Sequence, residues 1–159
     1  MTDPMDALNS LQTALNAGTV PLRPCDQHPN LWVLFDQPNS NPRFTYALLD
    51  GRVVQAIALF VLIEPYDGLP RFQVGYAVLE RFRGRGIGSQ VFQESISELT
   101  NGLSRTPIKS FYLEAIVAVG NNASNAMARK HISESPIVCK DVLSNEDALQ
   151  YFKRIAGDA

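Results

Sequence analysis

Three glycines and two arginines alternate in residues 83–88, Arg-Gly-Arg-Gly-Ile-Gly, at the start of a stretch with helical periodicity. The N-terminus of a helix presents unpaired N–H groups and the positive end of the helix dipole, and glycines let a ligand come close to the backbone. Two arginines at that end repel each other and the dipole unless an anion is present. The pattern therefore predicts an anion cradle, best suited to a pyrophosphate, in preference to a simple tight turn.

The residues on either side of this loop predict a strand that leads directly into a helix. Before the loop, apolar residues alternate with a period of two at Phe72, Val74, Tyr76 and Val78. After it, apolar residues recur at helical spacing, namely Ile87, Val91, Phe92, Ile96, Leu99 and Leu103. Two better-known phosphate loops are excluded. The dinucleotide fingerprint requires Gly where Ser89 stands, and the P-loop requires a Gly-Lys-Ser/Thr that the sequence lacks.

These segments resemble the GNAT superfamily of acyl-CoA-dependent N-acetyltransferases. Residues 76–78, Tyr-Ala-Val, and the loop 83–88 are similar to its strand and its Arg/Gln-x-x-Gly-x-Gly/Ala signature. A second block, Asn121-Asn-Ala-Ser124 followed by Met127-Ala-Arg-Lys130, resembles the Asn-x-x-Ser/Ala helix of the same superfamily. The resemblance covers about residues 43–155 and implies acetyl transfer from acetyl-CoA to a primary amine by direct attack on the thioester.

The resemblance also implies where acetyl-CoA binds, with its pyrophosphate on the loop and its pantetheine arm along the preceding strand. The cofactor-binding residues expected on this basis are Tyr76, Ala77, Val78, Arg83, Gly84, Arg85, Gly86, Ile87, Gly88, Ser89 and Asn121. A second hypothesis stays open, in which the domain binds CoA or acyl-CoA but has lost catalysis and acts as a sensor or protein-binding module. Ala128, which stands where the superfamily often has a catalytic Tyr, favours that alternative slightly.

Acyl transfer to an amine requires a group that removes the amine's proton and donors that stabilise the growing negative charge. Glu114 is the candidate base, because it projects from the predicted strand 109–117 on the face opposite the apolar side chains. A plain surface carboxylate is an equally supported interpretation. Ser124 is the candidate proton donor to the departing thiolate, against the alternative of a serine that only caps or begins a helix. A backbone N–H near Val78 is the expected donor to the carbonyl oxygen.

The remaining pattern predicts one α/β domain over residues 1–159, a GNAT-like fold with a mixed, mostly antiparallel sheet, splayed central strands and helices on both faces. Asp3-Pro4 and Gly18 predict the ends of an N-terminal helix over about 4–17, and Asp50-Gly51 predicts a β-hairpin. The other expected elements are strands at 31–35, 43–49, 52–64, 72–79 and 109–117, a turn at 65–70, a loop bounded by Asn101-Gly102 and Pro107, a helix at 121–131, and a closing pair of strands at 137–143 and 148–155, although 147–154 suits a helix equally well.

Composition limits the class of protein. A chain of 159 residues that is 45% hydrophobic provides enough apolar material for one core. The net charge of −2 argues against nonspecific attachment to nucleic acid or membranes. The start lacks the basic and apolar regions of a signal peptide, and the longest apolar run, Ala56–Ile63, is too short to cross a bilayer. We therefore expect a soluble, cytoplasmic protein.

Metal and disulfide chemistry are not expected, since Cys25 and Cys139 lie outside any Cys-x-x-Cys pattern and His28 and His131 lack partners at metal-binding spacing. Residues 1–70 carry three basic and seven acidic side chains, a local balance of −4. Such asymmetry is usually solvated surface, but an acceptor site in this half would attract a cationic amine. The acceptor, an amine-bearing small molecule or a protein or peptide, stays open among a peptide N-terminus, a lysine, a polyamine and an amino sugar. A homodimer also stays open.

Overall fold

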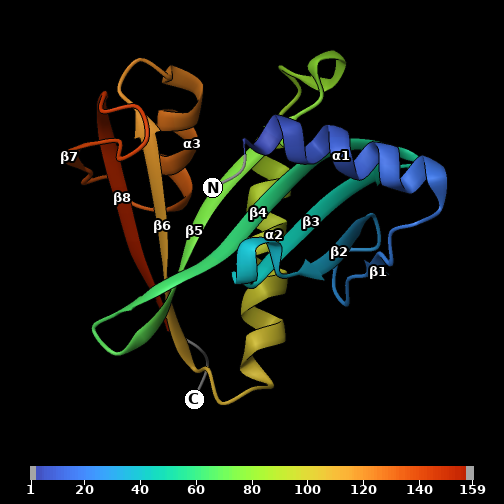
Figure 1. Cartoon of the computed structure of the whole chain (residues 1–159), viewed down its shortest axis with the longest axis horizontal. Helices are drawn as coiled ribbons and strands as arrows, with labels where there is room; N and C mark the ends of the chain where they lie inside the picture. Colours follow the sequence, from blue (N-terminus) through green and yellow to red (C-terminus); the bar gives the residue numbers. More distant parts are fainter. Residues whose placement is uncertain (1–2, 157–159) are drawn as a thin grey trace.

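One mixed sheet runs through the computed structural model, which describes residues 3–156, and helices cover both of its faces (Figure 1). Within that range the sheet has eight strands in the order β1-β2-β3-β4-β5-β6-β8-β7. The helices are α1 (Pro4–Ala17), α2 (Ile87–Ser104) and α3 (Asn122–His131). The strands are β1 (Arg23–Pro24), β2 (Leu31–Asp36), β3 (Arg43–Asp50), β4 (Val53–Tyr66), β5 (Leu69–Val78), β6 (Ser110–Ala118), β7 (Ile137–Lys140) and β8 (Asp147–Ala156), with short 3-10 turns at Pro38–Ser40 and Glu80–Phe82. The predicted fold class is confirmed.

Helix α1 covers one face of the sheet, and its ends are those the sequence predicts. The Asp3 side chain accepts a hydrogen bond from the Met5 N–H, and Gly18 ends the helix in the left-handed conformation. The buried side chains of α1 pack in a cluster with the sheet residues Ala47, Val54, Ile57, Leu59 and Ala77. The larger cluster lies on the opposite face, under α2 and α3. Among the described residues, none of the helices has the length and apolar character that a membrane crossing needs.

The central strands β5 and β6 run parallel and pair over only three residues of each strand. The pairs are Arg71 with Tyr112, Phe72 with Leu113, and Gln73 with Glu114. Beyond Gln73, β5 stays paired with β4, while β6 stays paired with β8 along its whole length. The two halves of the sheet therefore separate toward the C-terminal ends of β5 and β6, as the resemblance implied, and Figure 1 shows β6 and β8 leaning away from β5.

Two local predictions were wrong. The turn predicted over 65–70 is only the pair Asp67-Gly68, both with positive φ, while Pro65 and Pro70 lie inside β4 and β5 beside an irregularity in the ladder, where a missing N–H is tolerated. The loop expected to begin at Asn101-Gly102 begins after Ser104, because Leu103 is buried and holds the last turn of α2 against the core. The strand predicted at 148–155 is confirmed as β8, which is paired with both β6 and β7, so the helical alternative for 147–154 does not hold.

A polar cluster is buried between α2 and the segment that precedes β2. Glu98 is 6% exposed, and its carboxylate accepts hydrogen bonds from His28 Nδ1 at 2.7 Å and from the Gln27 N–H at 2.9 Å. Burial, and then the charge of Glu98, raise the pKa of the nearby Cys25 thiol to about 12. The pKa of Tyr46 is also raised, first by burial, then by Cys25 and then by Glu98. Cys25 is therefore a protonated, unreactive thiol.

Replacing His28 by Ala should destabilise the fold by about 1–3 kcal/mol, because the buried Glu98 carboxylate would lose one of its two hydrogen-bond donors. The matched control is Arg105→Ala, which breaks an ion pair with Asp26 whose two side chains are 65% and 56% exposed. That control should change the free energy of unfolding by less than about 1 kcal/mol. Urea unfolding of the two variants measures both effects, and equal losses would show that the Glu98 cluster is not a stabilising feature.

Candidate active site

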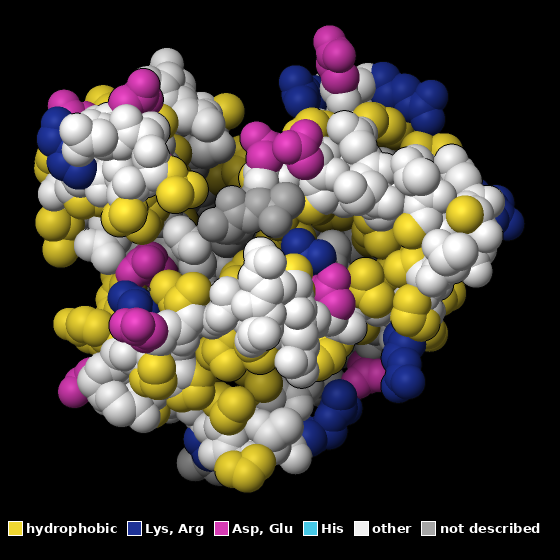
Figure 2. All heavy atoms as spheres, in the orientation of Figure 1, with side chains coloured by type: hydrophobic (Ala, Val, Ile, Leu, Met, Phe, Trp, Pro, Cys, Tyr) yellow, Lys and Arg dark blue, Asp and Glu magenta, His cyan; other side chains and the backbone are white. Residues whose placement is uncertain are grey.

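A cavity of about 1130 Å³ lies where β5 and β6 separate, and the N-termini of α2 and α3 border it. Most of the residues expected to bind the cofactor line it, namely Tyr76, Ala77, Val78, Arg83, Gly84, Gly86, Ile87, Gly88, Ser89 and Asn121, and the candidate Ser124 lines it too. Arg85 and Glu114 are expected site residues that do not line it. Figure 2 shows a hollow between the part of the molecule that holds α3, β7 and β8 and the part that holds α1.

The N-terminus of α2 faces this cavity without a side-chain cap. Its N-cap residue is Gly86, with φ of 76°, and within residues 3–156 no side chain caps the N–H groups of the first turn. A Cβ built on Gly84 or Gly86 would meet nothing within 4 Å, so the space in front of these two glycines is open. Unpaired N–H groups facing open space are the arrangement that binds a phosphate at a helix N-terminus.

Gly88 has a different role from the two glycines before it. A Cβ at this position would lie 3.3 Å from the Tyr76 ring and 3.3 Å from Val78 Cγ2. The absence of a side chain therefore lets the first turn of α2 pack directly on β5. This contact fixes the position of the helix N-terminus relative to the strand, so Gly88 shapes the cavity without having to contact a ligand itself.

The arginines are oriented less simply than the sequence suggested. The Arg83 Nε donates a hydrogen bond of 3.0 Å to the Val78 carbonyl oxygen, which ties the glycine loop to the end of β5. The guanidinium groups of Arg81 and Arg85 lie 5.0 Å and 5.8 Å from the centre of the Phe82 ring. Of these residues, Phe82 and Arg83 line the cavity. The loop and the 3-10 turn before it thus carry three cations beside an uncapped helix N-terminus, one bonded to a carbonyl oxygen and two placed over an aromatic ring.

Lys130 and His131, at the end of α3, reach the first turn of α2. Lys130 Nζ donates to Ser89 Oγ at 3.2 Å, and His131 Nε2 lies 2.8 Å from the same oxygen. Burial, then the charges of Lys130 and Lys153, lower the pKa of His131 from its usual 6.5. A helix was predicted at this position, but no pattern in the sequence indicated that its end contacts the glycine loop.

Because His131 is harder to protonate in the folded state, the protein should lose stability as the pH falls below about 6.5, where the unfolded state binds the extra proton. Replacing His131 by Gln keeps a hydrogen-bonding group for Ser89 but cannot titrate. Between pH 6.5 and 5, we expect the natural chain to lose unfolding free energy that the variant does not lose, so the variant becomes more stable relative to the natural chain. A difference that does not change with pH would contradict the assignment.

The edge of β5 that faces the cavity has free backbone groups. The Leu79 N–H donates to Gln55 O on the β4 side, so alternation directs the N–H and C=O groups of Tyr76 and Val78 the other way, toward the gap. Past Gln73, no strand in the described part of the chain pairs with this edge. Ala77 differs, because alternation turns its peptide groups toward β4 and its side chain packs under α1. The Val78 N–H is therefore available as a donor in the gap.

Two hydroxyl groups meet across the cavity. Ser124 Oγ lies 3.4 Å from the Tyr76 hydroxyl oxygen, which joins α3 to β5. The cap of α3 is Asn121, whose Oδ1 accepts from the Ser124 N–H at 3.1 Å, so Ser124 sits in the first turn and is not the cap. Ala128 is 4% exposed and belongs to the core under the helix.

Glu114 lies at the last position where β6 pairs with β5, on the sheet face that α1 covers further along. Its carboxylate is 4% exposed, and Oε2 accepts from Arg71 NH1 at 3.2 Å and from Gln150 Nε2 at 2.9 Å. The interpretation of Glu114 as an ordinary surface carboxylate is therefore wrong. Its partner in the register, Gln73, does line the cavity. Glu114 is thus one residue behind the cavity wall and holds β5, β6 and β8 together where the gap begins.

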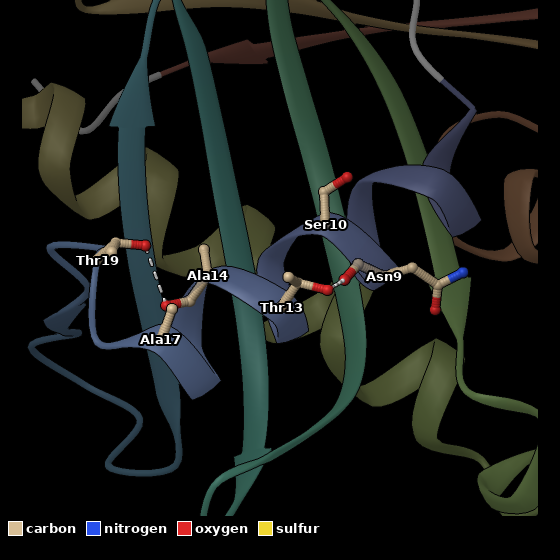
Figure 3. Close-up of a pocket in the computed structure, with 6 residues that line it drawn as sticks. All are labelled: Asn9, Ser10, Thr13, Ala14, Ala17 and Thr19. Atoms are coloured by element: carbon tan, nitrogen blue, oxygen red, sulfur yellow. Dashed lines mark hydrogen bonds between the residues drawn. The ribbon is translucent and has the colours of Figure 1, made fainter.

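A second hollow, of about 480 Å³, lies on the outer surface of α1 (Figure 3). Its lining is Asn9, Ser10, Thr13, Ala14, Ala17 and Thr19, and none of these side chains is an acid or a base. The two threonine hydroxyls donate to backbone carbonyls of Asn9 and Ala14. This surface has no group available for acyl transfer.

The chain belongs to the GNAT acetyltransferase family, because the model of the Acetyltransferase (GNAT) family matches residues 9–132. Among solved structures, RimL, a ribosomal L7/L12 alpha-N-protein acetyltransferase in complex with coenzyme A, is 26% identical with a TM-score of 0.55. The alignment covers 73% of this chain and 64% of that one, so the chain spans less than two thirds of this relative's length.

Two further structures are similar. An acetyl transferase from Salmonella typhimurium that modifies the N-terminal serine of ribosomal protein L7/L12 is 25% identical, with a TM-score of 0.50 and coverage of 71% of this chain and 64% of that one. A ribosomal-protein-alanine N-acetyltransferase from Brucella melitensis is 18% identical, with a TM-score of 0.53 and coverage of 97% and 80%, and it shows the fold alone. No curated protein matches the chain.

Proposed function

We propose that the chain is an acetyl-CoA-dependent N-acetyltransferase whose acceptor is the α-amino group of a polypeptide. The observation that carries this proposal is one cavity in which an uncapped helix N-terminus and an unpaired strand edge lie together. The first provides N–H groups for phosphates, and the second provides backbone partners for an extended amide chain. The two most similar relatives named above both act on the N-terminus of a ribosomal protein, which supports a polypeptide acceptor.

The residues present suit acetyl-CoA. The open space in front of Gly84 and Gly86, the uncapped first turn of α2 and the nearby Arg83 and Lys130 suit its pyrophosphate. The gap-facing backbone groups of Tyr76 and Val78 suit the amides of its pantetheine arm. When bound, acetyl-CoA supplies the acyl group as a reactive thioester.

The chain's own groups then fall on two sides of the gap. Ser124 and Tyr76 belong to the side that holds α2 and α3, where their paired hydroxyls would donate a proton to a departing thiolate. Gln73 and Glu114 belong to the opposite face, where the amine would enter. We assign Glu114 as the group that takes the amine's proton, either directly on Oε1 or through an intervening water. Among the described residues, both hydrogen bonds to this carboxylate fall on Oε2. The Val78 N–H would stabilise the carbonyl oxygen.

Binding of CoA can be tested with two glycines that have nearly the same conformation. Gly86 and Gly68 have φ of 76° and 74°, and a Cβ on either meets nothing within 4 Å, but only Gly86 lines the cavity. Valine at either position should cost about 1–3 kcal/mol of folding stability through backbone strain. CoA at a hundred times its Kd should stabilise the natural chain and Gly68→Val by about 2.7 kcal/mol and Gly86→Val far less. Equal thermal shifts in the two variants would show that the N-terminus of α2 does not bind the CoA pyrophosphate.

Proton transfer can be tested by the pH dependence of turnover at saturating acetyl-CoA. Glu114→Gln should lower kcat on the order of a hundredfold and remove the acidic limb of the pH profile. Arg71→Gln is the control, because it breaks the same ion pair and leaves the carboxylate. If the two variants lose rate equally with unchanged profiles, Glu114 only holds the strands together.

The hydroxyl pair should matter less than the base. A thiolate leaving group has a pKa of about 8.5 and can depart without full protonation. Ser124→Ala and Tyr76→Phe should therefore each lower kcat by roughly tenfold or less and the double variant by about the same as either one, since the two act as a unit. Additive losses in the double variant would contradict a shared proton donor.

A CoA-binding module without catalysis is the alternative, and the buried Ala128 at the usual Tyr position favours it. Acetyl-CoA turnover against a panel of amines separates the two functions. Intact CoA binding with no turnover on any amine would establish the module.

A further inference from the structure

The same cavity is bordered by two segments from opposite ends of the chain that neither motif includes. Residues 3–5, at the start of α1, and residues 141–143, in the loop between β7 and β8, both line it together with the glycine loop. We call these two segments the mouth. The mouth contains two carboxylates and three apolar side chains, whereas the glycine loop contains two arginines. The cavity therefore has a cationic part and an acidic, apolar part.

Two apolar side chains of the mouth, those of Val142 and Leu143, are unusually open to water. Val142 is 93% exposed and Leu143 is 85% exposed, more than any other large hydrophobic side chain among the described residues. Their turn is well held, because Asp141 Oδ1 accepts from the Leu143 and Ser144 N–H groups and the Asp141 N–H donates to Glu146 O. The backbone thus presents these side chains at the edge of a cavity. Figure 2 shows apolar side chains gathered on the part of the molecule with α3, β7 and β8 that borders the hollow.

The acidic groups of the mouth have acceptor capacity to spare. Asp3 uses Oδ1 for the Met5 N–H and Asp141 uses Oδ1 for its turn. Among the described residues, no hydrogen bond falls on Oδ2 of either carboxylate, and neither forms an ion pair. A cationic amine near the mouth would be attracted by both.

We infer that the mouth selects a polypeptide N-terminus whose first side chain is apolar. The inference rests on the proposed function and specifies, in addition, the type of the first residue of the polypeptide acceptor. An α-ammonium group with an apolar side chain beside it matches carboxylates that stand next to Val142 and Leu143. A polyamine offers several charges without a branched apolar group, and an amino sugar offers hydroxyls that would leave the two side chains in water.

The test is the ratio of kcat/KM for two short peptides that differ only in a first residue of Leu or Ser. The natural chain should prefer the Leu peptide by about tenfold or more, the range in which an apolar pocket discriminates. The double variant V142S/L143S should bring the ratio near one. The matched control is I137S/V138S, since these two β7 side chains are 64% and 73% exposed but do not line the cavity, and its ratio should not change. A ratio within one variant does not depend on how much protein is folded.

Binding of the same peptides to the CoA-saturated chain is measured in parallel by calorimetry. Transfer without a Leu preference, or a preference that survives V142S/L143S, overturns the inference and leaves the proposed function intact. A Leu preference in binding without any transfer supports the mouth and refutes the enzyme. Faster transfer to spermidine, or to the lysine of an N-terminally blocked peptide, overturns the inference as well.

Discussion

The structure depends on a parallel pair of strands that stops pairing after three residues. Up to Gln73 and Glu114, β5 and β6 belong to one sheet, and beyond them each strand stays with its other neighbour. The partly buried Arg71–Glu114 ion pair crosses from β5 to β6 beside this point, and Gln150 of β8 joins it. A buried ion pair of this kind adds little net stability but strongly fixes which groups lie together. Among the described residues, the backbone groups on this edge of β5 past Gln73 have no strand partner, which is costly in a core and useful at a binding site.

The two helices beside the gap contribute different groups to the site, because each follows a different one of the two separating strands. Helix α2 begins directly after β5, and Gly88 lets its first turn lie against Tyr76, so the helix N-terminus is held beside the unpaired strand edge. Helix α3 follows β6 and brings Ser124 to Tyr76 at one end and Lys130 to Ser89 at the other. The two halves of the sheet are thus connected across the gap by side chains rather than by strand pairing, and a ligand in the gap would contact both.

The sequence was sufficient for the parts of the site that rest on local rules. The caps of α1, the Asp50-Gly51 hairpin and the strand–glycine–helix unit follow from backbone conformation and hydrophobic period, so they could be read directly. The direction of the Arg83 side chain could not, because it depends on the Val78 carbonyl coming within 3.0 Å. Glu114 shows the same limit, since its burial requires Arg71 and Gln150, which lie 43 and 36 residues away in the chain. The mouth was missed because an exposed Val142-Leu143 pair has no periodicity that distinguishes it from an ordinary loop.

Amide hydrogen exchange with and without saturating CoA tests the central claim most directly, namely that the unpaired edge of β5 binds an extended chain. Tyr76 and Val78 direct their N–H groups into the gap, whereas Ala77 between them directs its own toward β4. We predict that CoA slows exchange at Tyr76 and Val78 and leaves Ala77, already protected, unchanged. If CoA binds and exchange at Tyr76 and Val78 is unaffected, the gap between β5 and β6 is not where this chain holds its cofactor.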